Sequence, residues 1–283
     1  MSTKRSLKIA VASGKGGTGK TLVAVNLALS VFADQVLDCD VEEPNAYIFL
    51  EPTEKICKPV DMLVPKIDEQ KCTYCRKCAE FCQFNAIFVA GETVMVFSEL
   101  CHSCGGCKLV CPVDAITEKP RSIGDIYIGK AEGIELVYGM LNVGEALAVP
   151  VISAVKNEMK KEGTVILDSP PGTACPVVES VKDTDFCIMV TEPTPFGLHD
   201  LKIVTEVVAQ LGIPYGVVVN FAGVGDKGVY EFCSKKGIPI LLEIPYDRSI
   251  AELYSEGIPF VKEMHEWKPR FQALFEKIQV MTK

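Results

Sequence analysis

Apolar residues form short runs along the chain, separated by polar or glycine-rich segments. Short uninterrupted runs are typical of strands buried on both faces of a parallel sheet. Strands are predicted at 7–12, 35–37, 134–140, 164–167, 186–190, 215–219 and 240–244. Longer amphipathic stretches predict helices, among them 22–32, a stretch after Pro150, and 269–281. The pattern therefore predicts an α/β fold with a mostly parallel sheet flanked by helices.

A glycine-rich segment joins the first predicted strand to the first predicted helix. It reads Gly14-Lys15-Gly16-Gly17-Thr18-Gly19-Lys20-Thr21 and fits the phosphate-loop pattern G-x-x-x-x-G-K-[ST]. Glycines let successive N–H groups converge on an anion, and the helix start adds its positive dipole end. We expect Lys20 to reach the β- and γ-phosphates and the Thr21 hydroxyl to bind Mg²⁺. The expected phosphate-binding residues of this ATP or ADP site are Gly14, Gly16, Gly17, Thr18, Gly19, Lys20 and Thr21.

Acidic residues follow two of the predicted strands. The strand at 35–37 ends in Asp38-Cys39-Asp40, and the strand at 164–167 ends in Asp168-Ser169-Pro170-Pro171-Gly172. The carboxyl ends of parallel strands meet at one edge of the sheet, so Asp40 and Asp168 should lie near the nucleotide. Asp168 suits a role in holding Mg²⁺. The alternatives are a helix or turn cap for Asp40, and likewise for Asp38, and a proline-rich exit from the strand for the second segment.

Eight of the thirteen cysteines lie in one segment. Cys72, Cys75, Cys78 and Cys82 have the spacing C-x2-C-x2-C-x3-C, and Cys101, Cys104, Cys107 and Cys111 repeat it at an offset of 29 residues (101 − 72). Ala86-Ile87 recurs as Ala115-Ile116 at the same offset, so the segment is an internal duplication. Residues 87–89 and 93–97 between the two runs predict a hairpin. The spacing is that of bacterial ferredoxins, and the segment resembles a ferredoxin with two [4Fe–4S] clusters.

In that pattern three close thiolates bind one cluster, and the fourth cysteine of each run binds the other cluster. The resemblance implies a first cluster on Cys72, Cys75, Cys78 and Cys111, and a second on Cys82, Cys101, Cys104 and Cys107. Two structural zinc sites are the alternative, although such sites usually combine two separated C-x2-C pairs. The other cysteines share no spacing and are expected to be inert, with a third cluster at Cys175 as the alternative.

Composition narrows the classes of function. A net charge of −8 and a pI near 5.1 argue against nucleic acid or an anionic membrane as a general partner. No apolar run approaches the ~20 residues of a transmembrane helix, and residues 1–8 are short and charged, unlike a signal peptide. We therefore expect a cytoplasmic protein whose thiols stay reduced. The proline-rich stretch 43–65 is expected to be an irregular connector out of the core.

The phosphate loop carries an additional lysine, Lys15, at its second position. With it, the loop resembles the deviant Walker A loop of the MinD, ParA, Mrp and nitrogenase iron protein superfamily, in which this lysine reaches the nucleotide of a dimer partner. The resemblance implies that Asp40 positions the attacking water and that the N–H of Gly172 senses the γ-phosphate. It also implies that Asn220 contacts the adenine and that Asp247 belongs to the loop framing it; an ordinary turn after a strand is the alternative for both.

Nearly the whole chain resembles a MinD-superfamily P-loop ATPase with an inserted ferredoxin. The ATPase domain would comprise residues 1–60 and 120–283, and the insert, a small α+β ferredoxin-like unit, residues 61–119. The resemblance implies Mg²⁺-dependent ATP hydrolysis, with Lys15, Lys20 and Asp40 as catalytic residues. The site would lie between the subunits of a homodimer, or of a heterodimer with a related ATPase.

The position of the insert suggests what the nucleotide controls. Because it begins soon after Asp40, we expect ATP to change the orientation or exposure of the two clusters. The favoured function is ATP-gated electron transfer to a redox partner protein. The alternatives are an Mrp-like iron–sulfur carrier or assembly ATPase with an acceptor protein, and a MinD-like positioning ATPase with structural or sensory clusters.

Overall fold

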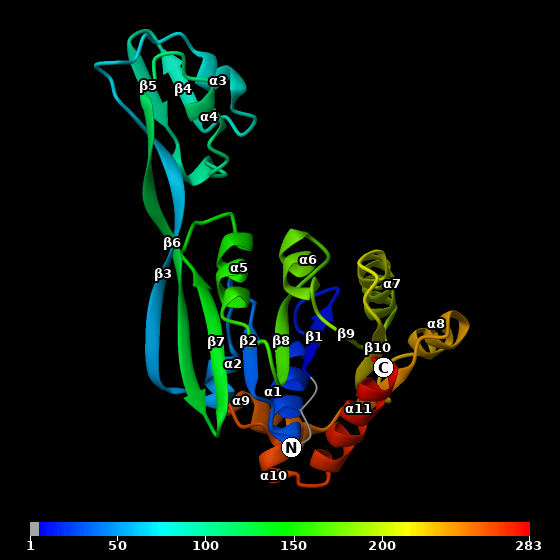
Figure 1. Ribbon diagram of the computed structural model, residues 1–283. Helices are drawn as coiled ribbons and strands as arrows, with labels where there is room; N and C mark the ends of the chain where they lie inside the picture. The colour runs from blue at the N-terminus through cyan, green and yellow to red at the C-terminus, as the bar shows by residue number, and fades with distance from the viewer. Residues whose placement is uncertain (1–5) are drawn as a thin grey trace.

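The computed structural model describes residues 6–283. One sheet has the strand order β11-β10-β9-β1-β8-β2-β7-β6-β3 (Figure 1). Its neighbours are parallel from β11 to β7, and β6 and β3 join antiparallel at one edge. The strands are β1 (Leu7–Ser13), β2 (Gln35–Asp38), β3 (Thr53–Ile67), β6 (Ile116–Ala131), β7 (Ile134–Leu141), β8 (Thr164–Pro171), β9 (Phe186–Thr191), β10 (Tyr215–Ala222) and β11 (Ile240–Pro245). The predicted α/β fold with a mostly parallel sheet is confirmed.

Helices cover both faces of this sheet. Alternate residues of β1 point to opposite faces, so Ile9 packs in one core and Ala10 in the other. The first face is covered by α1 (Lys20–Val31), α2 (Ala46–Leu50), α9 (Arg248–Ser255), α10 (Phe260–Glu263) and α11 (Trp267–Met281). The second is covered by α5 (Val149–Asn157), α6 (Cys175–Val181), α7 (Pro195–Gln210) and α8 (Gly228–Lys236).

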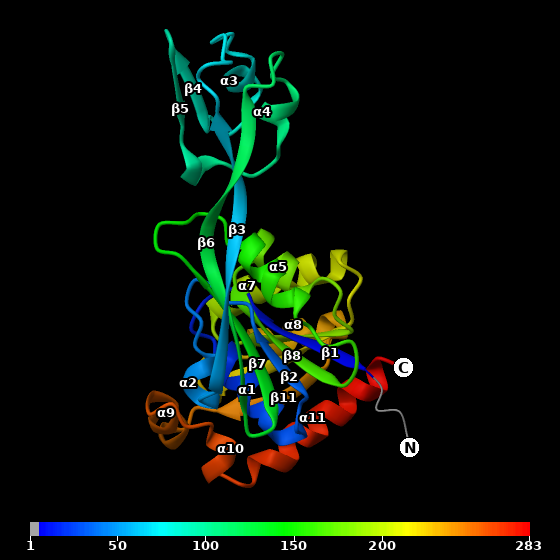
Figure 2. The same cartoon turned by 60° about the vertical axis from the view of Figure 1, so that its left-hand side comes forward.

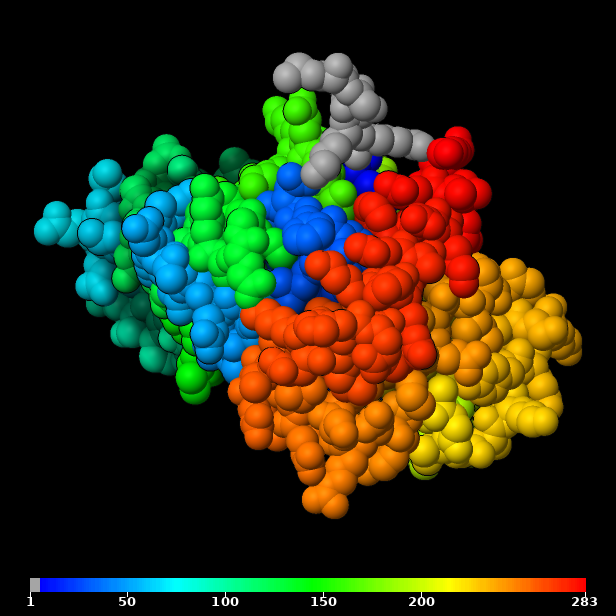
Figure 3. Space-filling view, turned by 90° about the horizontal axis from the view of Figure 1, so that it is seen from below, coloured from blue at the N-terminus to red at the C-terminus, as the bar shows by residue number. Residues whose placement is uncertain are grey.

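The C-terminal helix α11 lies beside α1. Figure 3 shows the C-terminal part of the chain, in orange and red, across the side opposite to the insert. Its residues Phe271, Leu274 and Ile278 are buried, so the predicted terminal helix packs against the ATPase core. Of the helices in residues 6–283, none is long and apolar enough to cross a bilayer. Residues 1–8 were expected not to form a signal peptide. Residues 1–5, which are most of this segment, lie outside the part of the chain that the structure describes.

The expectation of an irregular connector at 43–65 is wrong. This stretch forms α2 and most of β3, which pairs with β6 along its whole length. An edge strand tolerates Pro59 and Pro65 because its outer N–H groups need no partner. Beyond the end of β7, Asp61–Ile67 and Ile116–Ser122 continue as a two-stranded ribbon (Figure 2). The two strands run unbroken through the predicted domain boundaries.

The ribbon carries the cysteine-rich insert away from the sheet (Figures 1 and 2). The insert contains α3 (Lys77–Phe81), β4 (Ile87–Ala90), β5 (Thr93–Val96), the 3-10 turn η1 (Ser98–Leu100) and α4 (Gly106–Leu109). β4 and β5 pair as the predicted antiparallel hairpin. Because the insert is small and stands apart, many of its apolar side chains remain exposed.

Candidate functional site

The phosphate loop lies between β1 and α1, at the carboxyl edge of the parallel sheet. Gly17 and Gly19 have left-handed φ angles of 77° and 93°, which glycine adopts without strain. Lys20 and Thr21 open α1 and are buried. A cavity of about 290 Å³ lies against the loop. Its wall includes Gly16, Gly17, Gly19, Lys20, Thr21, Asp40, Pro171, Asn220, Phe221, Asp247 and Tyr254.

Two buried acids stand behind Thr21. Its hydroxyl donates a short hydrogen bond to Oδ2 of Asp168, whereas Oδ1 of Asp168 has no hydrogen-bond partner in the described residues. Burial and the charge of Asp38 raise the pKa of Asp168 well above its usual range. A divalent cation would favour the ionised carboxylate and use its unpartnered oxygen. The Thr21 and Asp168 oxygens therefore fit the expected Mg²⁺ site.

Asp38 anchors the loop that follows β2. Its carboxylate accepts hydrogen bonds from the backbone N–H groups of Asp40 (3.1 Å), Asn45 (3.0 Å) and Ala46 (3.0 Å). Burial raises its pKa to about 6, although the three N–H groups favour the charged form. The sequence predicted Asp40 as the functional member of the pair, with a helix or turn cap as the alternative for both acids. Asp38 has such a capping role, because it accepts from the N–H groups at the start of α2. An acid that ends a buried strand needs such donors for its oxygens.

Asp40 lies on the cavity wall and is partly exposed. Burial, and next the charge of Asp38, raise the pKa of its carboxyl to about 7. A carboxylate that titrates near neutrality suits the acceptance of a hydrogen bond from water.

Two other predicted residues have partners away from the cavity. Nζ of Lys15 lies 3.1 Å from Oε1 of Glu192, which follows β9. The N–H of Gly172 donates to the carbonyl of Ser13 (3.0 Å). Neither Lys15 nor Gly172 contributes to the wall of the cavity. Glu192 was missed, although its position after a parallel strand places it at the same edge of the sheet.

Asn220 and Asp247 also line this cavity. Nδ2 of Asn220 donates to the carbonyl of Thr18 (2.9 Å) and so holds the phosphate loop. Asp247 caps α9 by accepting a hydrogen bond from the N–H of Ser249 (2.8 Å). Both residues thus have structural partners in addition to their position beside the cavity.

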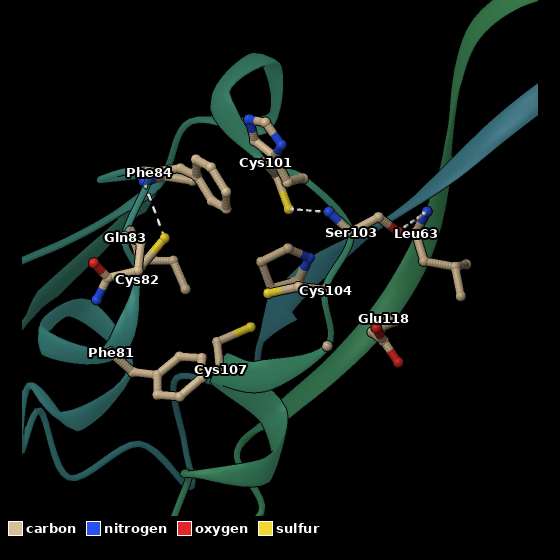
Figure 4. Close-up of a pocket in the computed structure, with 15 residues that line it drawn as sticks. Leu63, Phe81, Cys82, Gln83, Phe84, Cys101, Ser103, Cys104, Cys107 and Glu118 are labelled. Atoms are coloured by element: carbon tan, nitrogen blue, oxygen red, sulfur yellow. Dashed lines mark hydrogen bonds between the residues drawn. The ribbon is translucent and has the colours of Figure 1, made fainter. Parts of the chain in front are cut away.

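The eight clustered cysteines surround two cavities in the insert. Cys72, Cys75, Cys78 and Cys111 line one, and Cys82, Cys101, Cys104 and Cys107 line the other. In the second cavity the four thiols point into the same space (Figure 4). Each cavity thus receives three thiols from one half of the duplication and one from the other half. The remaining walls are mostly apolar.

The duplication extends to backbone conformation. Left-handed φ angles occur in pairs 29 residues apart, at Tyr74 and Ser103, at Arg76 and Gly105, and at Asn85 and Asp114. The N–H groups of Ala86 and Ala115 each donate to a thiol sulfur at 3.3 Å, that of Cys82 and Cys111 respectively. N–H groups directed at sulfur are a feature of iron–sulfur sites.

The thiols are arranged around spaces and not around a point. Within residues 6–283 no group of three or more His, Cys, Asp or Glu side chains converges as the ligands of one metal ion. A [4Fe–4S] cluster binds each thiolate through a different iron atom, so its ligands lie further apart than those of one zinc ion. Each cavity presents the four thiols that such a cluster would need as ligands. Of the other cysteines, Cys57 and Cys175 are exposed.

Comparison with known proteins agrees with the nucleotide site. The family model of the CobQ/CobB/MinD/ParA nucleotide binding domain matches residues 9–260. The chain belongs to this family. It is therefore a P-loop ATPase of the MinD/ParA type. An uncharacterized protein of Methanocaldococcus jannaschii is 35% identical and aligns over 90% of this chain and 91% of its own length.

Two further similarities concern iron–sulfur proteins and fold. An iron–sulfur cluster carrier protein of M. jannaschii is 25% identical over 96% of this chain and 85% of its own length. The structure of the septum site-determining protein MinD of Pyrococcus horikoshii, complexed with Mg-ADP, has a TM-score of 0.58 at 21% identity and 96% coverage of both chains. This second similarity concerns the fold of the ATPase.

Proposed function

We propose that this ATPase binds two [4Fe–4S] clusters in its insert and uses ATP to control electron transfer to a redox partner protein. The observation that carries the proposal is the pair of cavities, each lined by four cysteines from both halves of the duplication. Cys72, Cys75, Cys78 and Cys111 would hold one cluster, and Cys82, Cys101, Cys104 and Cys107 the other. A bound cluster supplies a centre that accepts or donates one electron.

On the nucleotide side, the chain acts by positioning and electrostatics. Lys20 and the loop N–H groups hold the phosphates, while Thr21 and Asp168 hold Mg²⁺. Asp40 orients the attacking water. Asn220 contacts the adenine, and Asp247 belongs to the loop that frames it.

Two residues must change partners when a nucleotide dimer forms. Lys15 leaves Glu192 to reach the partner's nucleotide in a homodimer or a heterodimer with a related ATPase. The N–H of Gly172 leaves Ser13 to sense the γ-phosphate. Such exchanges are the usual basis of order changes in nucleotide switches.

A second candidate is supported by a specific observation. The similarity to iron–sulfur cluster carrier proteins extends over 96% of this chain. In that function a cluster is cargo, and the protein passes it to an acceptor protein. Ligation by four thiols per cavity favours retention, and therefore electron transfer, over release.

One experiment separates the two. The full chain is loaded with iron and sulfide under anaerobic conditions, its clusters are reduced with dithionite, and excess reductant is removed. It is then mixed with Mg²⁺ and ATP, an oxidised redox dye and an apo-ferredoxin. ATP-dependent reduction of the dye, with iron retained by the chain, supports electron transfer. Movement of iron and sulfide to the apo-ferredoxin supports the carrier function, and the lack of both outcomes contradicts both candidates.

A further inference from the structure

The ribbon leaves the sheet at a β-bulge. Val60 pairs with Gly124, but the next residue, Asp61, pairs with Ser122, so Ile123 is the extra residue. A bulge bends its strand and increases the local twist. Ile123 is fully buried, and β7 pairs with β6 from Gly124 onward. The bulge is therefore the point about which the insert would turn relative to the sheet.

The loop after Asp40 is connected to this point by backbone hydrogen bonds. The carbonyl of Val41 accepts a hydrogen bond from the N–H of Leu141 (2.8 Å) at the end of β7. The adjacent N–H of Asn142 donates to the carbonyl of the bulge residue Ile123 (2.9 Å). A displacement of the loop after Asp40 would therefore act directly on the base of the ribbon.

One ion pair extends this connection across the bulge. Arg121, on the ribbon, makes a two-pronged contact with Glu145, which lies in the loop 142–148 between β7 and α5. Nη2 and Oε2 are 2.9 Å apart, and the two side chains are only 19% and 10% exposed. Two parallel charge-assisted hydrogen bonds fix orientation as well as distance. The pair ties the ribbon to the ATPase part of the chain.

The connection continues from the ribbon to a cysteine. Arg121 is paired with Met62 across the ribbon, and the N–H of the next residue, Leu63, donates to Oγ of Ser103 (3.0 Å). The N–H of Ser103 in turn donates to Sγ of Cys101 (3.4 Å) (Figure 4). The pKa of Arg121 is raised by its hydrogen bond to Glu145 and also by nearby negative charge, including that of Cys101.

The two cavities differ in their relation to the ribbon. Leu63 and Pro65 line the cavity of Cys101, whereas Ile67 and Ile116, at the far end of the ribbon, line the other. Hydrogen bonds and charges near the sulfur atoms set the reduction potential of an iron–sulfur cluster. The cavity of Cys101 is thus the one that a change at the ribbon base reaches first.

We propose that the Arg121–Glu145 pair transmits the nucleotide state from the loop after Asp40 to the cavity of Cys82, Cys101, Cys104 and Cys107. Arg121 is a positioning residue: it touches neither nucleotide nor thiol chemistry. The inference rests on the proposed function and adds its route and its selectivity, because the ribbon meets the cavity of Cys101 at Leu63 and reaches the cavity of Cys72 at its far end.

The test uses the cluster-loaded full chain, with and without Mg²⁺ and a non-hydrolysable ATP analogue. Hydrogen exchange is followed by mass spectrometry across the insert, and the potentials of the two clusters are measured by redox titration. The variants are Arg121→Gln, Glu145→Gln and the swapped pair Arg121→Glu with Glu145→Arg. Lys182→Gln is the matched control, because it removes the Lys182–Glu179 ion pair (2.6 Å) at α6, away from the ribbon and the insert.

In the unsubstituted chain we expect the ATP analogue to change the rate of hydrogen exchange in residues 98–104 by about fivefold or more. It should also shift the reduction potential of one of the two clusters. Arg121→Gln and Glu145→Gln should each reduce the exchange response to less than about twofold and remove the shift of potential, with ATP hydrolysis retained. When Arg121→Gln and Glu145→Gln are combined in one chain, their effects on the nucleotide response should not add, because both substitutions break the same contact. The swapped pair should restore part of the response, and Lys182→Gln should leave it unchanged.

The outcomes distinguish this inference from the proposed function. A full nucleotide response in Arg121→Gln and Glu145→Gln would overturn the inference and leave the proposed function standing. The lack of any nucleotide response in 61–119 of the unsubstituted chain would overturn both. An equal response of the two clusters would contradict the selectivity.

Discussion

Asp38 and Asp168 lie opposite each other on the neighbouring parallel strands β2 and β8, and both side chains are fully buried. Burial raises the pKa of both carboxyl groups, and the charge of Asp38 raises the pKa of Asp168 further. The charge of Asp38 also acts on Asp40, two residues away, at the edge of the nucleotide cavity. Asp38 therefore affects the pH at which the carboxyl group of Asp40 ionises.

A pH dependence follows from the Asp40 pKa of about 7. If water is held by the ionised carboxylate, activity is lost as pH falls through this value. The ionised fraction rises from about 10% at pH 6 to about 90% at pH 8, so kcat/KM for ATP should rise about ninefold. Asp40→Asn should lower kcat/KM about 100-fold and flatten the profile.

Asp38→Asn offers a second measurement on the same profile. The substitution removes a negative charge beside Asp40 and should move the midpoint to lower pH. A profile of the unsubstituted enzyme that is flat from pH 6 to 8 would contradict the role of Asp40.

The Lys15–Glu192 pair predicts opposite effects of two substitutions. The side chains are 34% and 18% exposed, and such pairs contribute at most about 1 kcal/mol, so Lys15 exchanges its partner readily. Lys15→Ala should reduce ATP-dependent dimerisation and hydrolysis together, by about tenfold or more. Glu192→Gln should strengthen dimerisation by about twofold. Sedimentation at several concentrations measures the dimer, and a monomeric Lys15→Ala variant with normal hydrolysis would disprove action across the interface.

Gly14 and Gly16 provide a matched pair within the phosphate loop. A Cβ at Gly14 would lie 2.6 Å from both Cβ and the backbone oxygen of Asp200 in α7, whereas a Cβ at Gly16 meets nothing within 4 Å. Gly14→Ala should lower the free energy of unfolding by about 1–3 kcal/mol, because backbone cannot move aside easily. Gly16→Ala should change it by less than about 0.5 kcal/mol. Urea unfolding without nucleotide makes the comparison, and equal losses would refute the packing argument.

Paired cysteine substitutions test how the two clusters share their ligands. If each variant removes the clusters to which its cysteines belong, Cys75→Ser with Cys111→Ser should lower the iron content from about eight to about four atoms per chain. Cys104→Ser with Cys111→Ser should remove nearly all iron. If instead the four cysteines of one run bound one cluster, the first double variant would lose nearly all iron and the second would keep about four atoms. Cys57→Ser, an exposed thiol on β3, is the control.

The sequence predicted those parts of the fold that depend on local pattern. The strands β1, β8, β9 and β10 are buried on both faces, so each is a continuous apolar run. The phosphate loop was predictable because its chemistry requires glycines and a lysine at fixed spacing. The hairpin in the insert was also predicted, since a glycine turn separates two β-branched runs.

The parts that were not predicted depend on distant partners. The first half of β3, Thr53–Pro59, is exposed, and its stability comes from pairing with a strand far along the chain, for example Pro59 with Asp125. Neither alternation nor propensity marks such a strand. The Arg121–Glu145 and Lys15–Glu192 contacts are likewise fixed by the fold, and no spacing in the sequence indicates them.

The ribbon beyond the bulge also has a mechanical consequence. Residues 61–67 extend about 23 Å at about 3.3 Å per residue, and they form a lever arm whose fulcrum is Ile123. A tilt of about 10° at the fulcrum moves the far end by about 4 Å, so a small displacement at the sheet edge is amplified at the cysteines. Such a tilt would present or withdraw the insert with little rearrangement of the two cores, and the length of the arm would determine how far the cysteines move.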